Sequence, residues 1–226
     1  MNRQRLRDNL ARVEERIANA CARVGRKRAD VTLIAVTKKV TPELAALLPE
    51  LGVRDLGENR PQELWRKAEA ITGVRWHLIG HLQRNKIERT LPIATWVHSV
   101  DSIRLLQALD QQAARPIDIL LECNASGEAA KSGFALTDVG ALAPVLAELK
   151  QVRVRGLMTM AALQEPESCR PTFVTLRQVR EQLQTQRTEH PFDHLSMGMS
   201  NDFEIAIEEG ATFIRLGTVL FEGIDG

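Results

Sequence analysis

The chain has 226 residues, of which 44% are hydrophobic, and this is ordinary for a soluble globular protein with a sizeable core. With 30 basic and 29 acidic residues the net charge is +1, so the charge balance indicates neither nucleic acid nor an anionic membrane as a partner. Three widely spaced cysteines, a charged N-terminus without an apolar core and the lack of any transmembrane stretch exclude a disulfide scaffold, a secretory signal and a membrane span, and we expect a cytoplasmic protein.

Residues 2–25 are predicted to form an amphipathic helix. Apolar side chains recur at steps of three and four residues, which is the period of one buried helix face. Those side chains are Leu6, Leu10, Val13, Ile17, Cys21 and Val24. We expect residues 1–28 to pack on the domain that follows.

Strand and helix patterns then alternate along the chain. The predicted strands are 31–38, 55–59, 76–80, 95–100, 117–124, 152–160, 194–200 and 213–221. The predicted helices are 42–51, 61–71, 83–91, 101–113, 137–150, 168–187 and 202–209, with a loop over 125–135. Eight such units predict an α/β fold, a single (β/α)8 TIM barrel over residues 1–226. An open doubly wound sheet is the alternative, but near-equal units without a split favour closure.

Two helix starts carry local signals. Thr41 before Pro42 is typical of an N-cap followed by proline at the first helical position. Asn201 with Glu204 three residues later resembles a capping box.

A lysine stands where the first strand leads into a helix. The run from Val31 to Val36 is apolar and β-branched, as in a buried strand. A period of two places Lys38 on the face of Ile34 and Val36, although the sequence does not decide which face is the inner one. Because burial disfavours the charged form, an amine at an apolar barrel mouth is a nucleophile toward aldehydes. We expect Lys38 to be that nucleophile and Lys39 to be solvated.

The ends of the seventh and eighth strands form a phosphate-type pattern. Ser200 precedes a predicted helix, whose first N–H groups and dipole favour an anion. Gly217 allows close backbone approach, and Thr218 adds a hydroxyl group. Phosphate sites of α/β barrels commonly lie after strands seven and eight. Each motif alone is weak, but together with Lys38 they indicate a phosphorylated ligand.

Arg215 lies inside an otherwise apolar strand, on the face that it shares with Phe213 and Gly217. A buried guanidinium is costly unless a carboxylate or a ligand pairs with it. One interpretation is a salt bridge to Glu58 or Glu122. The other is a hydrogen bond to the ring nitrogen of a cofactor. With an aldehyde-reactive lysine and a phosphate site, this second interpretation describes pyridoxal 5′-phosphate.

Histidines and methionines give weaker indications. His77 lies inside the third strand, where a satisfied core histidine is commoner than a catalytic one, and His81 is predicted to be exposed. Met197 and Met199 are adaptable core filler that could also pack on a flat ring. No pair of histidines has a metal-ligand spacing supported by carboxylates, and we expect no metal.

Seven short motifs, in their order, resemble those of the pyridoxal phosphate homeostasis proteins, a family similar to the N-terminal barrel of alanine racemase. They are AVTK at 35–38, LGEN at 56–59, WHLIGHLQRNK at 76–86, KSGF at 131–134, GLMTM at 156–160, LSMGMSND at 195–202 and IRLGTVLF at 214–221. The one departure is slight, since Thr37 precedes the lysine where many members have serine.

The resemblance implies that pyridoxal 5′-phosphate forms a Schiff base with Lys38. It also implies phosphate contacts from the seventh and eighth strand ends, an arginine near the pyridine nitrogen, and two further residues lining the cofactor. The expected site therefore comprises Lys38, Asn59, His77, Met199, Ser200, Arg215, Gly217 and Thr218.

Two classes of function fit such a site: a carrier that gives the cofactor to apo-enzymes, and an amino acid racemase. Racemisation needs acid–base groups on both faces of the cofactor. Alanine racemase, which is similar in its barrel, takes one of them from a tyrosine of a second domain. This sequence ends after the eighth strand and contains no tyrosine. An arginine at the ring nitrogen also weakens the cofactor as an electron sink. We expect a non-catalytic carrier, with a single-domain racemase as the alternative; a phosphosugar enzyme with a Schiff-base lysine would leave Arg215 without a role.

Overall fold

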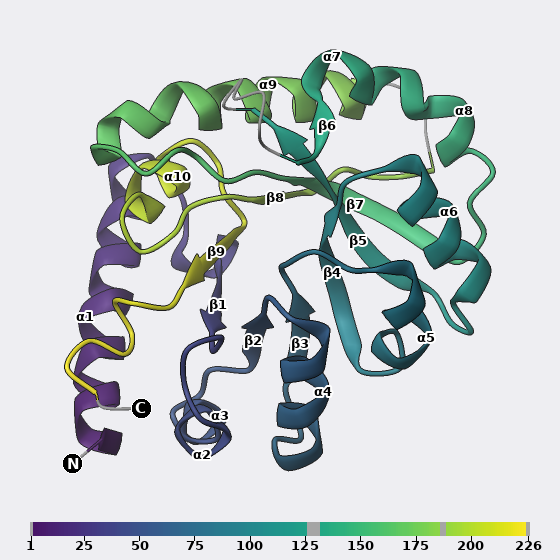
Figure 1. Ribbon diagram of the computed structural model, residues 1–226. Helices are drawn as coiled ribbons and strands as arrows, with labels where there is room; N and C mark the ends of the chain where they lie inside the picture. The colour runs from purple at the N-terminus through teal and green to yellow at the C-terminus, as the bar shows by residue number, and fades with distance from the viewer. Residues whose placement is uncertain (1, 126–131, 186–188, 225–226) are drawn as a thin grey trace.

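Parallel strands form a closed barrel in the computed structural model, which describes residues 2–125, 132–185 and 189–224 (Figure 1). The barrel strands are β1 Thr32–Val36, β2 Asp55–Glu58, β3 Arg75–Leu78, β4 Ala94–Val100, β5 Ile117–Asn124, β7 Val152–Met158, β8 His194–Ser196 and β9 Phe213–Leu216. Their order is β4-β3-β2-β1-β9-β8-β7-β5, and β5 pairs with β4 to close the ring. The predicted (β/α)8 barrel is confirmed, and the open sheet is wrong.

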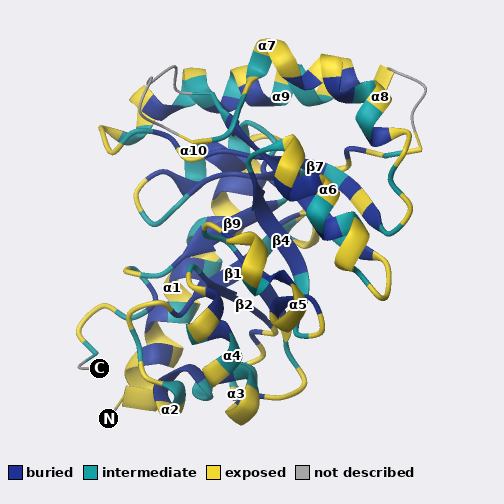
Figure 2. Ribbon diagram, turned by 45° about the vertical axis from the view of Figure 1, so that its right-hand side comes forward, coloured by how far each residue is buried: buried dark blue, intermediate teal, exposed yellow. Residues whose placement is uncertain are grey.

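Helices surround the barrel and turn one side toward it. In Figure 2 the strands are buried almost throughout, whereas the helices show a buried inner side and an exposed outer side. The helices are α1 Asn2–Arg23, α2 Pro42–Ala45, α3 Leu47–Glu50, α4 Pro61–Ala70, α5 Ile87–Thr90, α6 Ile103–Gln112, α7 Leu136–Val139, α8 Ala143–Leu146, α9 Arg170–Thr185 and α10 Phe203–Glu208. Within the described ranges, no helix is long and apolar enough to cross a membrane.

The predicted cap of the first barrel helix is confirmed, and the predicted capping box of the last one is wrong. Thr41 Oγ1 accepts a hydrogen bond from the backbone N–H of Leu44 at 3.3 Å, and Pro42 begins α2. α10 begins only at Phe203, and the Asn201 side chain donates to the carbonyl of Gln164 at 2.8 Å. Asn201 therefore fastens a neighbouring loop and does not cap α10.

Several elements are shorter than their sequence patterns predict. The predicted helix 137–150 is divided into α7, a 3-10 turn at Gly140–Leu142 and α8, with Pro144 in the first turn of α8. The predicted strands 152–160 and 213–221 end at Met158 and Leu216. The predicted loop 125–135 contains a short strand, β6 Phe134–Ala135, that pairs with β5. Lys131 of the KSGF motif and residues 186–188 of the predicted helix 168–187 lie outside the described residues.

The inside of the barrel is packed with side chains. An apolar cluster on the inward faces of the strands consists of Ile34, Trp96, Leu120, Met158 and Phe213. A Cβ atom on Gly57 would lie 2.8 Å from Cγ2 of Ile34, so β1 and β2 can pack here only because Gly57 has no side chain. The inward faces of β1 and β9 are thereby fixed: Ile34 and Arg215 lie side by side and both point inward.

Helix α1 packs alongside α10 and holds the segment that follows β9 (Figure 1). Its buried face is formed by Leu6, Asn9, Val13, Ile17, Ala20 and Cys21. Asn9 donates from Nδ2 to the carbonyls of Leu220 and Glu222, each at 3.0 Å. Val24 does not belong to this face, because the helix ends at Arg23 and Val24 is 43% exposed.

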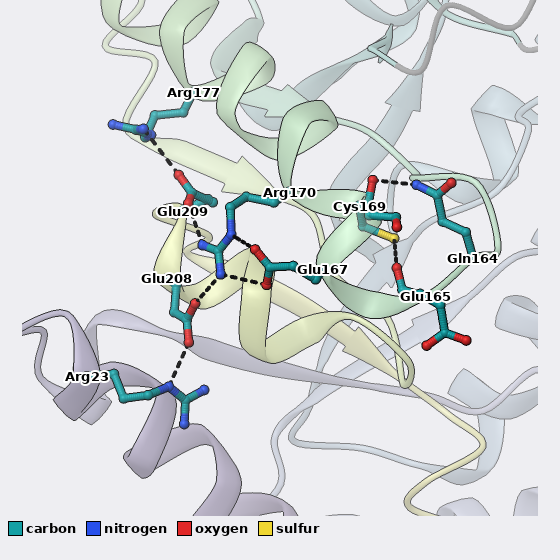
Figure 3. A network of polar contacts seen from close by, with 10 residues as sticks. Arg23, Gln164, Glu165, Glu167, Cys169, Arg170, Arg177, Glu208 and Glu209 are labelled. Carbon is teal, nitrogen blue, oxygen red and sulfur yellow. Dashed lines mark hydrogen bonds and ion pairs between the residues drawn. The ribbon is translucent and has the colours of Figure 1, made fainter.

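A network of charged side chains joins α1, α9 and α10 (Figure 3). The Arg170 guanidinium contacts Glu208 at 2.7 Å and Glu209 at 2.6 Å, and it also contacts Glu167. Glu208 accepts a second hydrogen bond from Nε of Arg23 at 2.7 Å. Hydrogen bonds to three carboxylates raise the pKa of Arg170. This network fixes the helices behind β8 and β9, whose ends carry the predicted phosphate site.

Candidate functional site at the barrel mouth

The C-terminal ends of β8, β9, β1 and β2 lie next to one another and carry most of the predicted site residues. Ala35 pairs with Leu216 of β9 on one side and with Leu56 of β2 on the other. Parallel strands in this register bring the residues that follow them to one edge. Lys38 therefore lies between Asn59, which follows β2, and Gly217, which follows β9.

Lys38 lies in an exposed turn, and the prediction that the strand continues to residue 38 is wrong. β1 ends at Val36, and the backbone N–H of Val40 donates to the carbonyl of Thr37 at 3.1 Å. Lys38 and Lys39 are both exposed. The surrounding residues therefore do not by themselves shield the Lys38 amine from water. The strand's inward face, which carries Ile34, leads to this turn.

The turn is anchored from below by a buried ion pair. Lys67 of α4 contacts Oε1 of Glu58 at 2.5 Å and donates to the carbonyl of Thr37 at 2.6 Å. The Thr37 hydroxyl donates to the same Glu58 oxygen at 2.6 Å. These three groups are buried between the barrel and α4. The backbone immediately before Lys38 is consequently held in one position.

Ser200 and the backbone after β9 form a small cup of hydrogen-bond donors. Ser200 Oγ accepts from the backbone N–H groups of Gly217 and Val219, each at 3.4 Å. Both distances are long for N–H···O bonds, so an anion can take over these donors at low cost. A Cβ atom on Gly217 would lie 3.2 Å from the carbonyl oxygen of Val36, so a larger residue fits only if the backbone shifts by a few tenths of an ångström.

Two neighbours complete the shape of this cup. Thr218, the predicted hydroxyl donor, is exposed, and Met199 beside Ser200 is half-buried. Asp202 accepts from the Met199 N–H at 2.6 Å and so fixes the loop between β8 and α10. The N–H groups of Asp202 and Phe203 both donate to the Met199 carbonyl, at 3.1 and 2.9 Å. These two N–H groups are therefore already satisfied within the loop, whereas the donors at Gly217 and Val219 come from the β9 side.

Arg215 is buried on the inward face of β9, close to the mouth. Nη1 donates to Ser196 Oγ at 2.5 Å, and Nη2 donates to the carbonyl of Thr159 at 2.9 Å. Among the described residues, no carboxylate lies within ion-pair distance, so the predicted salt bridges to Glu58 and Glu122 are wrong. Burial lowers the pKa of Arg215 to about 10, and it stays charged at neutral pH.

This arginine fits the ring nitrogen of pyridoxal phosphate. A guanidinium has five N–H donors and cannot accept a hydrogen bond. Arg215 makes two hydrogen bonds to the described residues, fewer than its five N–H groups can make, and a buried charge is favoured by further acceptors. A neutral ring nitrogen is an acceptor. The donor cup at Ser200 likewise fits a phosphate group, so both ends of the cofactor find suitable partners.

His77 and Asn59 occupy different levels of the barrel. His77 is fully buried on the inward face of β3, and both of its ring nitrogens bond to protein groups, Asp55 and His98, each at 2.9 Å. Asn59 is half-buried at the mouth, packed tightly on Gly80. A hollow of about 480 Å³ beside Asn59 is lined also by Gly80 and by exposed His81. The structure thus brings Asn59 to the mouth and places the polar atoms of His77 in the core.

Sequence reasoning missed four polar residues near this site: Ser196, Thr159, Asp202 and His98. Ser196 and Asp202 lie inside the LSMGMSND motif, and Thr159 lies inside GLMTM, so their signal was available. Glu122 accepts from the Ser132 hydroxyl at 3.0 Å, and burial raises the pKa of its carboxyl group. Throughout the described ranges, no cluster of histidine, cysteine and acidic residues could hold a metal ion.

Fold and site together define a class of protein. The sequence profile of the alanine racemase N-terminal domain matches residues 2–224. Alanine racemase from Corynebacterium glutamicum shares the fold, with a TM-score of 0.77 at 13% identity over 99% of this chain and 64% of that one. This chain is an alanine racemase N-terminal-domain-like barrel.

Relatives within that class are more specific. The pyridoxal phosphate homeostasis protein of Pseudomonas aeruginosa is 42% identical over 230 residues, which cover 96% of this chain and 95% of the relative. The protein of that name from Aquifex aeolicus is 40% identical over 220 residues, covering 95% and 96%. PipY of Synechococcus elongatus, solved with pyridoxal phosphate bound, is 35% identical with a TM-score of 0.79 over 91% of this chain and 99% of that one. The chain belongs to the pyridoxal phosphate homeostasis protein family.

Proposed function

We propose that this protein binds pyridoxal 5′-phosphate as a Schiff base on Lys38 and acts in cytoplasmic pyridoxal phosphate homeostasis. In this role it holds the reactive aldehyde and passes the cofactor to apo-enzymes, without catalysing an amino acid reaction. The family name of the relatives and the bound cofactor in PipY support this proposal. Three buried cysteine thiols, widely spaced along the chain, suit a reducing compartment.

Buried Arg215 is the observation that carries the proposal. No described carboxylate forms an ion pair with this arginine. Arg215 lies on β9, and the residues that follow this strand form the donor cup with Ser200. A ligand with a hydrogen-bond acceptor at one end and a phosphate at the other would bind to Arg215 and to the donor cup at the same time. When bound, pyridoxal phosphate supplies an aldehyde and an electron-withdrawing ring.

The remaining site residues have proposed roles around a ligand that extends from Arg215 to the donor cup. Ser200, Gly217 and Thr218 hold the phosphate group, and Lys38 in the adjacent turn reaches the aldehyde. Asn59 and Met199 border the ligand from neighbouring strand ends. His77 supports the site from the barrel core below the cofactor ring. It does so without a direct polar contact, because both of its imidazole nitrogens already bond to protein groups.

The alternative function, an amino acid racemase, requires a second acid–base group opposite Lys38. The sequence contains no tyrosine, and Arg215 keeps the ring nitrogen neutral. His81 is exposed and pairs with Asp101 at 3.3 Å, and Glu122 has a raised pKa. These two are the candidates for such a group.

One experiment separates the two functions. The protein loaded with pyridoxal phosphate is mixed in heavy water with L-alanine, and the alpha proton is followed by NMR; in parallel it is mixed with an apo-enzyme that needs the cofactor. The proposal predicts no enzyme-like exchange and recovery of the recipient's activity. Exchange that is lost in both Lys38→Ala and Glu122→Gln, or lost in Lys38→Ala and His81→Ala, would make the protein a racemase.

A further inference from the structure

A continuous chain of hydrogen bonds crosses the barrel interior from Arg215 to Asp55. Arg215 contacts Ser196 Oγ at 2.5 Å, and Ser196 Oγ lies 2.9 Å from Nδ1 of His98. Nε2 of His98 lies 2.9 Å from Nδ1 of His77, and Nε2 of His77 lies 2.9 Å from Oδ1 of Asp55. All five residues are at most 7% exposed. Neither the phosphate cup nor the Schiff base accounts for these histidines.

The two ends of the chain constrain the direction of the hydrogen bonds in it. Arg215 can only donate, so Ser196 Oγ accepts from it and keeps a proton that it can donate to Nδ1 of His98. Burial alone would raise the pKa of Asp55, but hydrogen bonds from His77 and Arg75 outweigh burial and lower it. The ionised carboxylate can only accept, so Nε2 of His77 donates to it.

Burial keeps both imidazoles neutral, and with Asp55 accepting at one end each ring then carries its proton on Nε2. His98 accepts at Nδ1 and donates at Nε2, and His77 does the same. The charged groups around them agree: His77 faces Asp55 and Arg75, while His98 faces His77, Arg215 and His194. Burial lowers the pKa of both histidines, and for His98 well below its ordinary value of 6.5.

A second proton on His98 would break this order. Nδ1 would become a donor toward Ser196 Oγ, which already accepts from Arg215. The Ser196 hydroxyl proton would then lose its acceptor in the chain. The hydrogen bonding of the serine that holds Arg215 thus depends on whether Nδ1 carries a proton in a histidine that does not touch Arg215.

We infer that His77 and His98 are positioning residues for the ligand at the barrel mouth: through Ser196 they fix the guanidinium of Arg215, so that its remaining N–H groups meet the ring nitrogen. The inference rests on the proposed function, because it assigns the ring nitrogen to Arg215. The chain of hydrogen bonds passes from β9 through β8, β4 and β3 and ends at the Asp55 carboxylate on β2, so four other strands support the position of Arg215.

The ligand side of the test uses two probes, pyridoxal phosphate and its carbocyclic analogue, in which C–H replaces the ring nitrogen. Dissociation constants are measured for the wild type, Ser196→Ala, His98→Gln and the conservative Ser196→Thr. We expect Ser196→Ala and His98→Gln to weaken pyridoxal phosphate about tenfold, since each loosens one charged hydrogen bond, and to leave the analogue unchanged. Ser196→Thr keeps the hydroxyl group and should retain wild-type affinity.

Equal weakening of both probes, or of neither, would overturn the positioning role. Failure of the wild-type protein to bind either probe would instead contradict the proposed function. A measurement on the ligand-free wild type keeps the inference testable if a variant does not fold. Nitrogen-15 NMR of the histidine rings at pH 7 should show both His77 and His98 neutral with the proton on Nε2; a proton on Nδ1 of either ring would refute the chain.

Discussion

At the scale of single residues, the phosphate cup depends on one hydroxyl group and one glycine. Ser200 Oγ accepts two long hydrogen bonds from the backbone of Gly217 and Val219, and a Cβ atom at Gly217 would make a tight contact with the Val36 carbonyl. Long bonds indicate donors that are only partly satisfied without a ligand. The cup therefore predicts selectivity for the phosphorylated form of the ligand.

The double variant Ser200→Ala with Thr218→Ala should weaken pyridoxal phosphate tenfold or more and hardly change the binding of unphosphorylated pyridoxal. Hydrogen bonds to a charged group are worth roughly 1.5–3 kcal/mol each, and the proposal assigns both hydroxyls to the phosphate. Titration of both ligands by absorbance measures the difference, with Thr175→Ala on the outer helix α9 as control. Equal weakening for the two ligands would place the phosphate elsewhere.

At the scale of elements, α4 fixes the turn that carries Lys38. The Lys67 and Glu58 side chains are 1% and 0% exposed, and both bond to Thr37. A buried ion pair contributes little net stability, but removal of one partner leaves an uncompensated charge. Oε2 of Glu58 already lacks a hydrogen-bond partner in the structure, so Glu58 has no reserve once Lys67 is lost.

Lys67→Ala should lower the free energy of unfolding by about 3–5 kcal/mol. The double variant Lys67→Met with Glu58→Leu should lose less than Lys67→Ala, because no charge remains buried. Arg66→Ala is the matched control on the same helix. The Arg66 side chain is 57% exposed and pairs with Glu63 on the surface. We expect its removal to change the free energy of unfolding by no more than about 0.5 kcal/mol. Urea unfolding measures all three. A Lys67→Ala protein as stable as Arg66→Ala would show that the pair is not structurally important.

The elements also show what the sequence could and could not predict. Apolar periodicity identified each barrel strand, because inward and outward faces both need apolar side chains. The sequence predicted that β1 continues to residue 38, but the strand ends at Val36. The carbonyl of the next residue, Thr37, accepts a hydrogen bond from Lys67, which lies 30 residues later in the sequence. Glu58 was proposed as a partner of Arg215, yet it points outward, since Asp55 and Gly57 take the inward face of β2. Local pattern does not reveal which faces meet.

The same reason explains the missed core of the site. His98 and Ser196 are 98 residues apart and meet only because the barrel closes. The motifs named Arg215 and Ser200 correctly as neighbours of one mouth, because β8 and β9 follow each other along the chain. Side chains from distant strands had no local signal that could join them.

At the scale of the whole molecule, buried histidines make the fold sensitive to acid. Burial lowers the pKa of His77, His98 and His194 in the folded protein. In the unfolded chain each returns to about 6.5, so below this pH the unfolded state binds more protons than the folded state. The stability that the neutral histidines contribute is therefore present above pH 6.5 and lost as the pH falls.

The free energy of unfolding should accordingly decrease between pH 7 and pH 5. Each tenfold difference in proton affinity between the two states is worth about 1.4 kcal/mol. Glu122, whose pKa is raised, acts in the opposite sense: its stabilising contribution grows as the pH falls through the raised pKa and is complete below its ordinary value of 4.5. Urea unfolding at a series of pH values tests this, with His81→Ala, a 68% exposed side chain, expected to keep the slope. Stability that is flat or rises toward pH 5 would contradict it.

The identity of the lysine that holds the cofactor tests the account most directly. The protein is loaded with pyridoxal phosphate, reduced with borohydride, digested and mapped by mass spectrometry, alongside Lys38→Ala and Lys39→Ala. We predict that the wild type and Lys39→Ala carry the reduced cofactor on Lys38 and that Lys38→Ala carries none at the barrel mouth. A label on Lys39, or the absence of any fixed cofactor from a protein that still binds it, would contradict the assignment of Lys38.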